Sequence, residues 1–181
     1  GQFKKLQHDN PKAYKLLCRL GCYRYQDVPL VPEEGIYYLL WEEEEKQRKR
    51  VIKALRDRSL IKCLNQEFYL HPVIKAEAID RLRGSKDWEI TNRKIAEFWT
   101  ESVKHVTNRI EGLKRLEAYN HYVDIEDWEN AVNILITVVN GSRLLAYLRA
   151  FGYLHKCLRI IKFLLNKPNL NKRYIVILRV H

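Results

Sequence analysis

The side chains of this 181-residue chain that could carry out acid–base or metal chemistry are few and scattered. No order of carboxylate, histidine and nucleophile connects the six histidines, which are His8, His71, His105, His121, His155 and His181. The acid pairs Glu33-Glu34 and Glu126-Asp127 stand at predicted helix starts, where capping explains them better than catalysis does. Cys18 and Cys22 lack a second close pair that would complete a zinc site, so we expect buried, reduced thiols and no metal.

Motifs that cradle a phosphate or activate a nucleophile are absent from the sequence. It contains no GxxxxGKS/T or GxGxxG loop and no HExxH, GxSxG or CxxC motif. We therefore expect that the chain is not an enzyme and that it holds no cofactor of its own.

The composition narrows the class of protein further. With 46% hydrophobic and 30% charged residues the chain can build a core, which excludes disorder, and its 7 Gly and 5 Pro argue against a turn-rich β fold. No run of about 18 apolar residues predicts a membrane span, and the first residues lack a signal-peptide core, so we expect a cytoplasmic protein. Because Met is absent even at position 1, we expect a piece of a longer chain.

Charge is unevenly distributed along the chain. Residues 1–83 carry 17 Lys/Arg against 12 Asp/Glu, residues 84–140 carry 7 against 10, and residues 141–181 carry 9 against none. The acid-free segment could contact nucleic acid or an acidic membrane surface. The interpretation we favour is a helix whose cationic face meets the acidic middle segment or a missing neighbour.

Local patterns predict two helices and an extended connection in the first 40 residues. Asp9 or Asn10 is predicted to cap a first helix that starts at Pro11 and is stopped by Gly21. Prolines then predict an extended connection, and a second helix follows Pro32.

A third helix, a hairpin and a closing helix are predicted next. The third helix covers residues 42–58, with acidic residues at its N-terminal end. Val51, Ile52 and Leu55 of this helix, and Trp41 just before it, can face a core. Short apolar runs at 60–64 and 68–70 predict a β-hairpin, and residues 73–82 predict another helix. This order of elements is that of a winged-helix domain, which we place at residues 1–84.

Residues 85–181 show helical periodicity throughout. Tyr122, Ala131 and Leu135 follow the aromatic, small and bulky order of a tetratricopeptide-like helix pair. Residues 168–181 are predicted to be either a helix start or a strand. The predicted helices begin at Trp88 and then cover residues 110–122, 128–139 and 144–165. The sequence therefore predicts a mainly α protein whose second domain, residues 85–181, consists of antiparallel helical hairpins, with the last 40 residues the least regular.

A winged helix often places its third helix in the major groove of DNA. The residues that could contact nucleic acid in that way are Arg48, Lys49, Arg50 and Lys53. Glu42–Glu45, however, would bring four acidic groups to the end of the helix that approaches the bases, so we do not favour nucleic-acid binding.

Four segments resemble a known family, and one of them, DWEITNRKIAEFWTESVK, looks like its helical linker. LCRLGCYRYQDVPLVPEEGIYYLLW and VIKALRDRSLIKCLNQEFYLHPVIKAEAIDRLR resemble the winged-helix region of bacterial STAND-class (NB-ARC-like) signal-transduction NTPases that carry C-terminal tetratricopeptide arrays. LEAYNHYVDIEDWENAVNIL is similar to the first repeats of that class. The resemblance covers roughly residues 15–140. Leu70-His71-Pro72 stands where the family has a Met/Leu-His-Asp-type motif, with Pro72 replacing the acidic residue.

The resemblance implies a nucleotide-operated switch. In the family an upstream P-loop module binds ADP or ATP and the motif histidine contacts the ADP phosphate, so His71 is the nucleotide-sensing residue that the resemblance suggests. For the isolated chain we favour a structural role, in which His71 holds the strand–helix corner by hydrogen bonds.

Two functions are consistent with these patterns. The first is a non-catalytic regulatory piece of a STAND-type NTPase, in which the winged helix couples a nucleotide-binding module of the same protein to a helical arm. This arm would bind a protein partner, with Tyr119, Tyr122 and Trp128 as the predicted contact surface. The alternative is a basic winged-helix module that binds nucleic acid as a transcription regulator.

Overall fold

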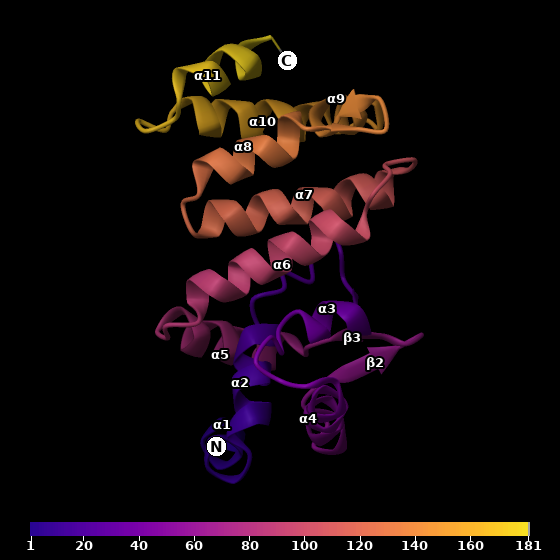
Figure 1. Ribbon diagram of the computed structural model, residues 1–181, viewed down its shortest axis with the longest axis vertical. Coiled ribbons are helices and arrows are strands. Elements are labelled where there is room, and N and C mark those ends of the chain that lie inside the picture. The colour runs from indigo at the N-terminus through magenta and orange to yellow at the C-terminus, as the bar shows by residue number, and fades with distance from the viewer. Residues whose placement is uncertain (181) are drawn as a thin grey trace. The chain divides into compact units, whose positions relative to one another are not determined.

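The computed structural model describes residues 1–180, and these residues are mainly helical (Figure 1). The chain divides into two compact units, Gly1–Ile95 and Ala96–His181. The division falls within helix α6 (Trp88–Ser102), later than the boundary that we expected at residue 84. The start of α6 belongs with the N-terminal unit because Cys22 Sγ donates a hydrogen bond to Asn92 Oδ1 at 3.3 Å.

The N-terminal unit contains five further helices and three strands, most of which the sequence predicts. In chain order they are α1 (Gln2–Asp9), α2 (Pro11–Leu20), β1 (Val31–Pro32), α3 (Glu33–Tyr37), α4 (Glu45–Asp57), β2 (Lys62–Leu64), β3 (Glu67–Tyr69) and α5 (Pro72–Arg83). Helix α1 was not predicted from the sequence, because its two buried residues, Phe3 and Leu6, are too few to reveal a period.

Helix α2 begins as predicted but ends for a different reason. The Asn10 side chain accepts a hydrogen bond from Ala13 N, and Pro11 occupies the first turn. Gly21 ends the helix with ordinary helical dihedrals (φ −63°), not with the left-handed conformation typical of a glycine stop. The glycine is needed for close packing, because a Cβ on Gly21 would lie 2.6 Å from both Ala78 Cβ and Ile79 N of α5.

The predicted hairpin is confirmed and gains a third strand. Strands β2 and β3 pair antiparallel, with Cys63 opposite Phe68, and β1 pairs with the other edge of β3. The connecting residues Asn65 and Gln66 both have positive φ, as a two-residue hairpin loop requires. Phe68 and Leu70 are buried, so the sheet contributes its inner face to the core of this unit.

The C-terminal unit contains the end of α6, five more helices and a small hairpin that we did not predict. The elements are α7 (Arg109–Asp124), α8 (Trp128–Ile136), β4 (Val138–Val139), β5 (Ser142–Arg143), α9 (Leu144–Ala150), α10 (Leu154–Leu165) and α11 (Lys172–Arg179). Helices α7 and α8 form an antiparallel pair (Figure 1), in which Ala131 and Leu135 are fully buried. Of the two structures predicted for residues 168–181, the helix is the one that forms within the described part, residues 168–180, as α11, and residue 181 lies outside the described residues.

Two predictions in the C-terminal unit are wrong. Residues 138–143 form a hairpin instead of continuing the helix, because Asn140-Gly141 adopts positive φ at both positions, which is the preferred sequence for a tight hairpin turn. The single helix predicted over 144–165 is broken into α9 and α10, because Gly152 takes a φ of +94° after the end of α9.

The close approach of α2 and α5 predicts that any side chain larger than hydrogen at position 21 destabilises the protein. We expect Gly21→Ala to lower the free energy of unfolding by about 1–3 kcal/mol, because the added methyl group overlaps backbone atoms that cannot rotate away. Urea unfolding followed by circular dichroism measures the change. Gly84→Ala is the matched control, since a Cβ there would lie 3.8 Å from Arg81 O and 3.9 Å from Asp80 O, which are ordinary contact distances. Equal effects of the two substitutions would contradict the packing argument.

Candidate functional site

His71 lies at the corner between β3 and α5. Its side chain is exposed, and its Nδ1 accepts a hydrogen bond from Val73 N at 3.2 Å, which caps the first turn of α5. Pro72 follows at the first helical position, where its missing N–H costs nothing. The structural role predicted for His71 is confirmed by this hydrogen bond, and its nucleotide-sensing role stays a prediction.

A surface groove of about 840 Å³ runs beside this corner, and we call it the α5 groove. One wall is a face of α5, the other is the loop at residues 24–30, and the hairpin contributes Leu64, Tyr69 and Leu70. Pro72 lines the groove, whereas His71 does not. The sequence alone does not reveal this groove, because its walls come from three segments that only the fold brings together.

The loop wall of the α5 groove is held in a strained conformation. Tyr25 has a φ of +56°, which is unusual for a bulky side chain. Its hydroxyl donates a hydrogen bond to Leu20 O at 2.8 Å, and burial raises the pKa of Tyr25 above its usual value. The strain is therefore tolerated by anchoring the loop to the end of α2.

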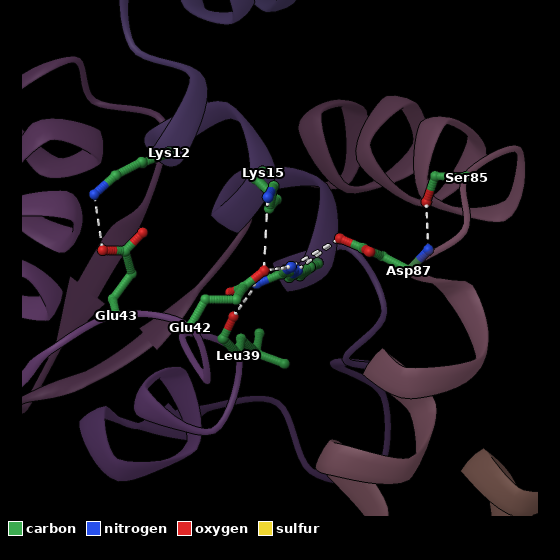
Figure 2. Close-up of polar contacts among 8 residues, drawn as sticks. Lys12, Lys15, Leu39, Glu42, Glu43, Ser85 and Asp87 are labelled. Carbon is green, nitrogen blue, oxygen red and sulfur yellow. Dashed lines mark hydrogen bonds and ion pairs between the residues drawn. The ribbon is translucent and has the colours of Figure 1, made fainter.

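A second charged site surrounds Arg19, whose side chain is only 1% exposed. Its guanidinium donates to both carboxylate oxygens of Glu42, with Nη1 at 2.7 Å from Oε2, and to Asp87 Oδ2 at 2.8 and 3.1 Å. Nη1 also donates to Leu39 O at 2.7 Å, and the guanidinium carbon lies 3.5 Å from the Trp41 ring centroid. The side chains of Glu42 and Asp87 accordingly point toward each other from different segments (Figure 2).

This cluster changes the electrostatics of the acidic block at residues 42–45. Hydrogen bonding to Arg19 lowers the pKa of Glu42 from 4.5 to about 2, and Lys15 adds a contact at 3.6 Å. Lys12 binds Glu43 at 2.9 Å, as Figure 2 also shows. Two of the four acidic residues that we expected in the third helix are therefore engaged with α2, and α4 starts only at Glu45.

The candidate nucleic-acid residues all lie on α4, but they differ in exposure and in the contacts of their side chains. Lys49 and Arg50 are exposed, whereas Arg48 donates from Nε to Glu43 O at 2.9 Å and Lys53 pairs with Asp57 at 2.6 Å. The exposed part of α4 is thus more cationic than the sequence of residues 42–58 suggests.

The predicted partner surface on the helical arm needs one correction. Tyr119 is 5% exposed, so its side chain belongs to the core and cannot form part of a contact surface. Burial raises its pKa to about 12. Tyr122 and Trp128 are half-buried, and the Trp128 ring packs edge-to-face on Phe163 at 5.9 Å. Only these two remain as candidate contacts.

Three of the cysteines match the expected burial. Cys18, Cys22 and Cys157 are buried and free, whereas Cys63 is exposed because it lies on β2, the edge strand of the sheet. Among residues 1–180 no group of three or more His, Cys, Asp or Glu side chains is arranged to hold a metal ion. Within the same range, no helix has the length and apolarity needed to cross a membrane.

Comparison with protein-family models, with curated proteins and with solved structures finds no match for this chain.

The Arg19 cluster predicts a large loss of stability when its cation is removed. We expect Arg19→Met to lower the free energy of unfolding by about 3–5 kcal/mol, because Glu42 and Asp87 lose the cation between them. Lys53→Met is the matched control, because both members of its pair with Asp57 are exposed (73% and 59%), and removing this pair should cost less than about 1 kcal/mol. Urea unfolding measures both, and a loss for Arg19→Met as small as that of the control would contradict the prediction.

Glu42 also predicts a dependence of stability on pH. Its pKa is lower in the folded protein than in the unfolded chain, so its contribution is complete above about pH 4.5 and is lost as the pH falls toward about 2. We expect Glu42→Gln to lower the free energy of unfolding at neutral pH. The difference in this free energy between the variant and wild type should shrink as the pH falls from about 4.5 toward about 2. Unfolding free energies measured across the window test this, and a difference that stays constant would contradict it.

Proposed function

We propose that this chain is a non-catalytic regulatory and protein-interaction piece of a STAND-type signalling NTPase. In this proposal the N-terminal unit is a winged helix that transmits a nucleotide switch, and the C-terminal unit is a tetratricopeptide-like arm that binds a protein partner. The observation that carries the proposal is the element order from α2 to α5, in which three helices are followed by a hairpin and a closing helix. The resemblance of residues 15–140 to that class supports the same assignment.

The C-terminal unit supports the role of an interaction arm. Helices α7 and α8 are joined by residues 125–127, and α9 and α10 by residues 151–153, so each pair folds back on itself. Helix pairs of this kind bury their apolar faces against neighbouring pairs and leave an extended surface for partners. Tyr122 and Trp128 are half-buried on one such pair, which is suitable for aromatic contact residues.

The chemistry of His71 is compatible with a nucleotide-sensing role. Because Nδ1 accepts the hydrogen bond from Val73 N, the proton of the neutral ring is on Nε2. Nε2 can therefore donate to a phosphate oxygen of ADP bound by a P-loop module of the same protein. In the proposal the nucleotide belongs to that module, and His71 supplies only this contact.

The interaction role predicts a loss of partner binding when the arm is altered. Proteins retained by the immobilised chain should be lost when Tyr122→Ala and Trp128→Ala are combined, with an affinity at least tenfold lower, or about 1.4 kcal/mol. Tyr37→Ala, a half-buried tyrosine of the other unit, is the control. Affinity chromatography with quantitative mass spectrometry measures retention. Equal retention by all three proteins would reject the interaction role, and a coding region without an upstream GxxxxGKS/T motif would reject the nucleotide switch.

One observation favours the second candidate function, nucleic-acid binding through α4. Glu42 and Glu43 bind Arg19 and Lys12 of α2 instead of projecting from α4, so the phosphate repulsion expected from this acidic block is reduced. Salt-dependent binding of duplex DNA, measured by fluorescence anisotropy and abolished by Lys49→Glu with Arg50→Glu, would select this function over the first.

A further inference from the structure

The α5 groove follows one face of α5 over most of its length. Pro72, Lys75, Ile79 and Arg83 line it at spacings of three or four residues, which places them on one stripe of the helix. A helix of twelve residues spans about 18 Å, so the groove is elongated and not a compact pocket.

The lining of the α5 groove combines apolar and charged side chains. Leu64, Leu70 and Ile79 give it an apolar lining, together with the rings of Tyr25 and Tyr69. The charged residues that line it are three cations, Arg24, Lys75 and Arg83, and a single carboxylate, Asp80. The groove therefore combines an apolar interior with an excess of positive charge.

The two walls of the groove are held in place by α2. The loop wall is anchored where Tyr25 donates to Leu20 O, and the helix wall is anchored where Gly21 packs on the backbone of Ala78 and Ile79. A groove with fixed walls loses little conformational entropy when it binds a partner.

We infer that the α5 groove is a docking site for an acidic peptide segment of a partner protein, with apolar side chains that fill the groove and carboxylates that meet Arg24, Lys75 and Arg83. Elongated grooves with an apolar floor are typical of sites that bind amphipathic peptides. A bilayer is a poorer occupant because its surface cannot enter a groove, so that of the apolar lining it would reach mainly Leu64, which is 53% exposed. The phosphates of DNA would leave the apolar lining unfilled. This site is separate from the helical arm, so the inference does not depend on the proposed function.

The experiment is a selection of random peptides displayed on phage against the immobilised full chain. We expect the selected peptides to carry net negative charge and spaced apolar residues. A fluorescein-labelled synthetic copy should bind in an anisotropy assay, and Lys75→Glu with Arg83→Glu should weaken this binding at least tenfold. Lys4→Glu with Lys5→Glu is the matched control, because it makes the same change of charge on exposed residues of α1 and should leave the affinity within about twofold.

A charge-swapped peptide, with Lys in place of its acidic residues, should bind the Lys75→Glu, Arg83→Glu variant better than wild type. This gain cannot come from a variant that has failed to fold. Selected peptides without acidic enrichment, equal losses in the two double variants, or no gain for the charge-swapped peptide would each overturn the inference. So would Lys75- and Arg83-dependent binding of duplex DNA or phosphatidylserine vesicles by a chain that selects no acidic peptide.

Discussion

A guanidinium that is only 1% exposed needs carboxylates and carbonyl oxygens beside it, because burying an uncompensated charge is costly. Arg19 of α2 meets this need with Glu42 and Leu39 from the segment before α4 and with Asp87 from the segment before α6. These contacts join three stretches of chain that are 20 to 68 residues apart in sequence. Satisfying one side chain therefore constrains where α4 begins and how the start of α6 is attached to the N-terminal unit.

The two surfaces of the N-terminal unit that could bind a partner both depend on α2. Through Arg19 and Lys12 this helix draws Glu42 and Glu43 away from α4, and so leaves α4 more cationic. Through Gly21 and the carbonyl of Leu20 it holds α5 and the loop that carries Tyr25, which form the walls of the α5 groove. The charge of one surface and the shape of the other thus follow from contacts made by a single helix.

The C-terminal unit contains another buried guanidinium, which lies at the end of α6. Arg115 is 7% exposed, and its Nη1 donates to Thr100 O at 3.2 Å and Val103 O at 2.8 Å, where the last carbonyls of a helix lack partners. Burial lowers the pKa of this guanidinium, and the partial negative charge at the helix end favours its charged form. Tyr119 belongs to the core of this unit, whereas Tyr122 and Trp128 of the same helix pair stay partly exposed.

Features set by a few adjacent residues could be predicted from the sequence alone: the start of α2 at Asn10-Pro11, the β2–β3 hairpin, and the capped corner at His71-Pro72. The turns at Asn140-Gly141 and Gly152 also depend only on adjacent residues. They were not predicted because the flanking residues have helical periodicity. Only the tertiary structure decided that Arg19 is buried, that Glu42 faces α2, that Tyr119 lies in the core and that three segments enclose the α5 groove. The physical reason is that capping and turn formation involve neighbours in sequence, whereas burial and charge pairing depend on which distant segments pack together.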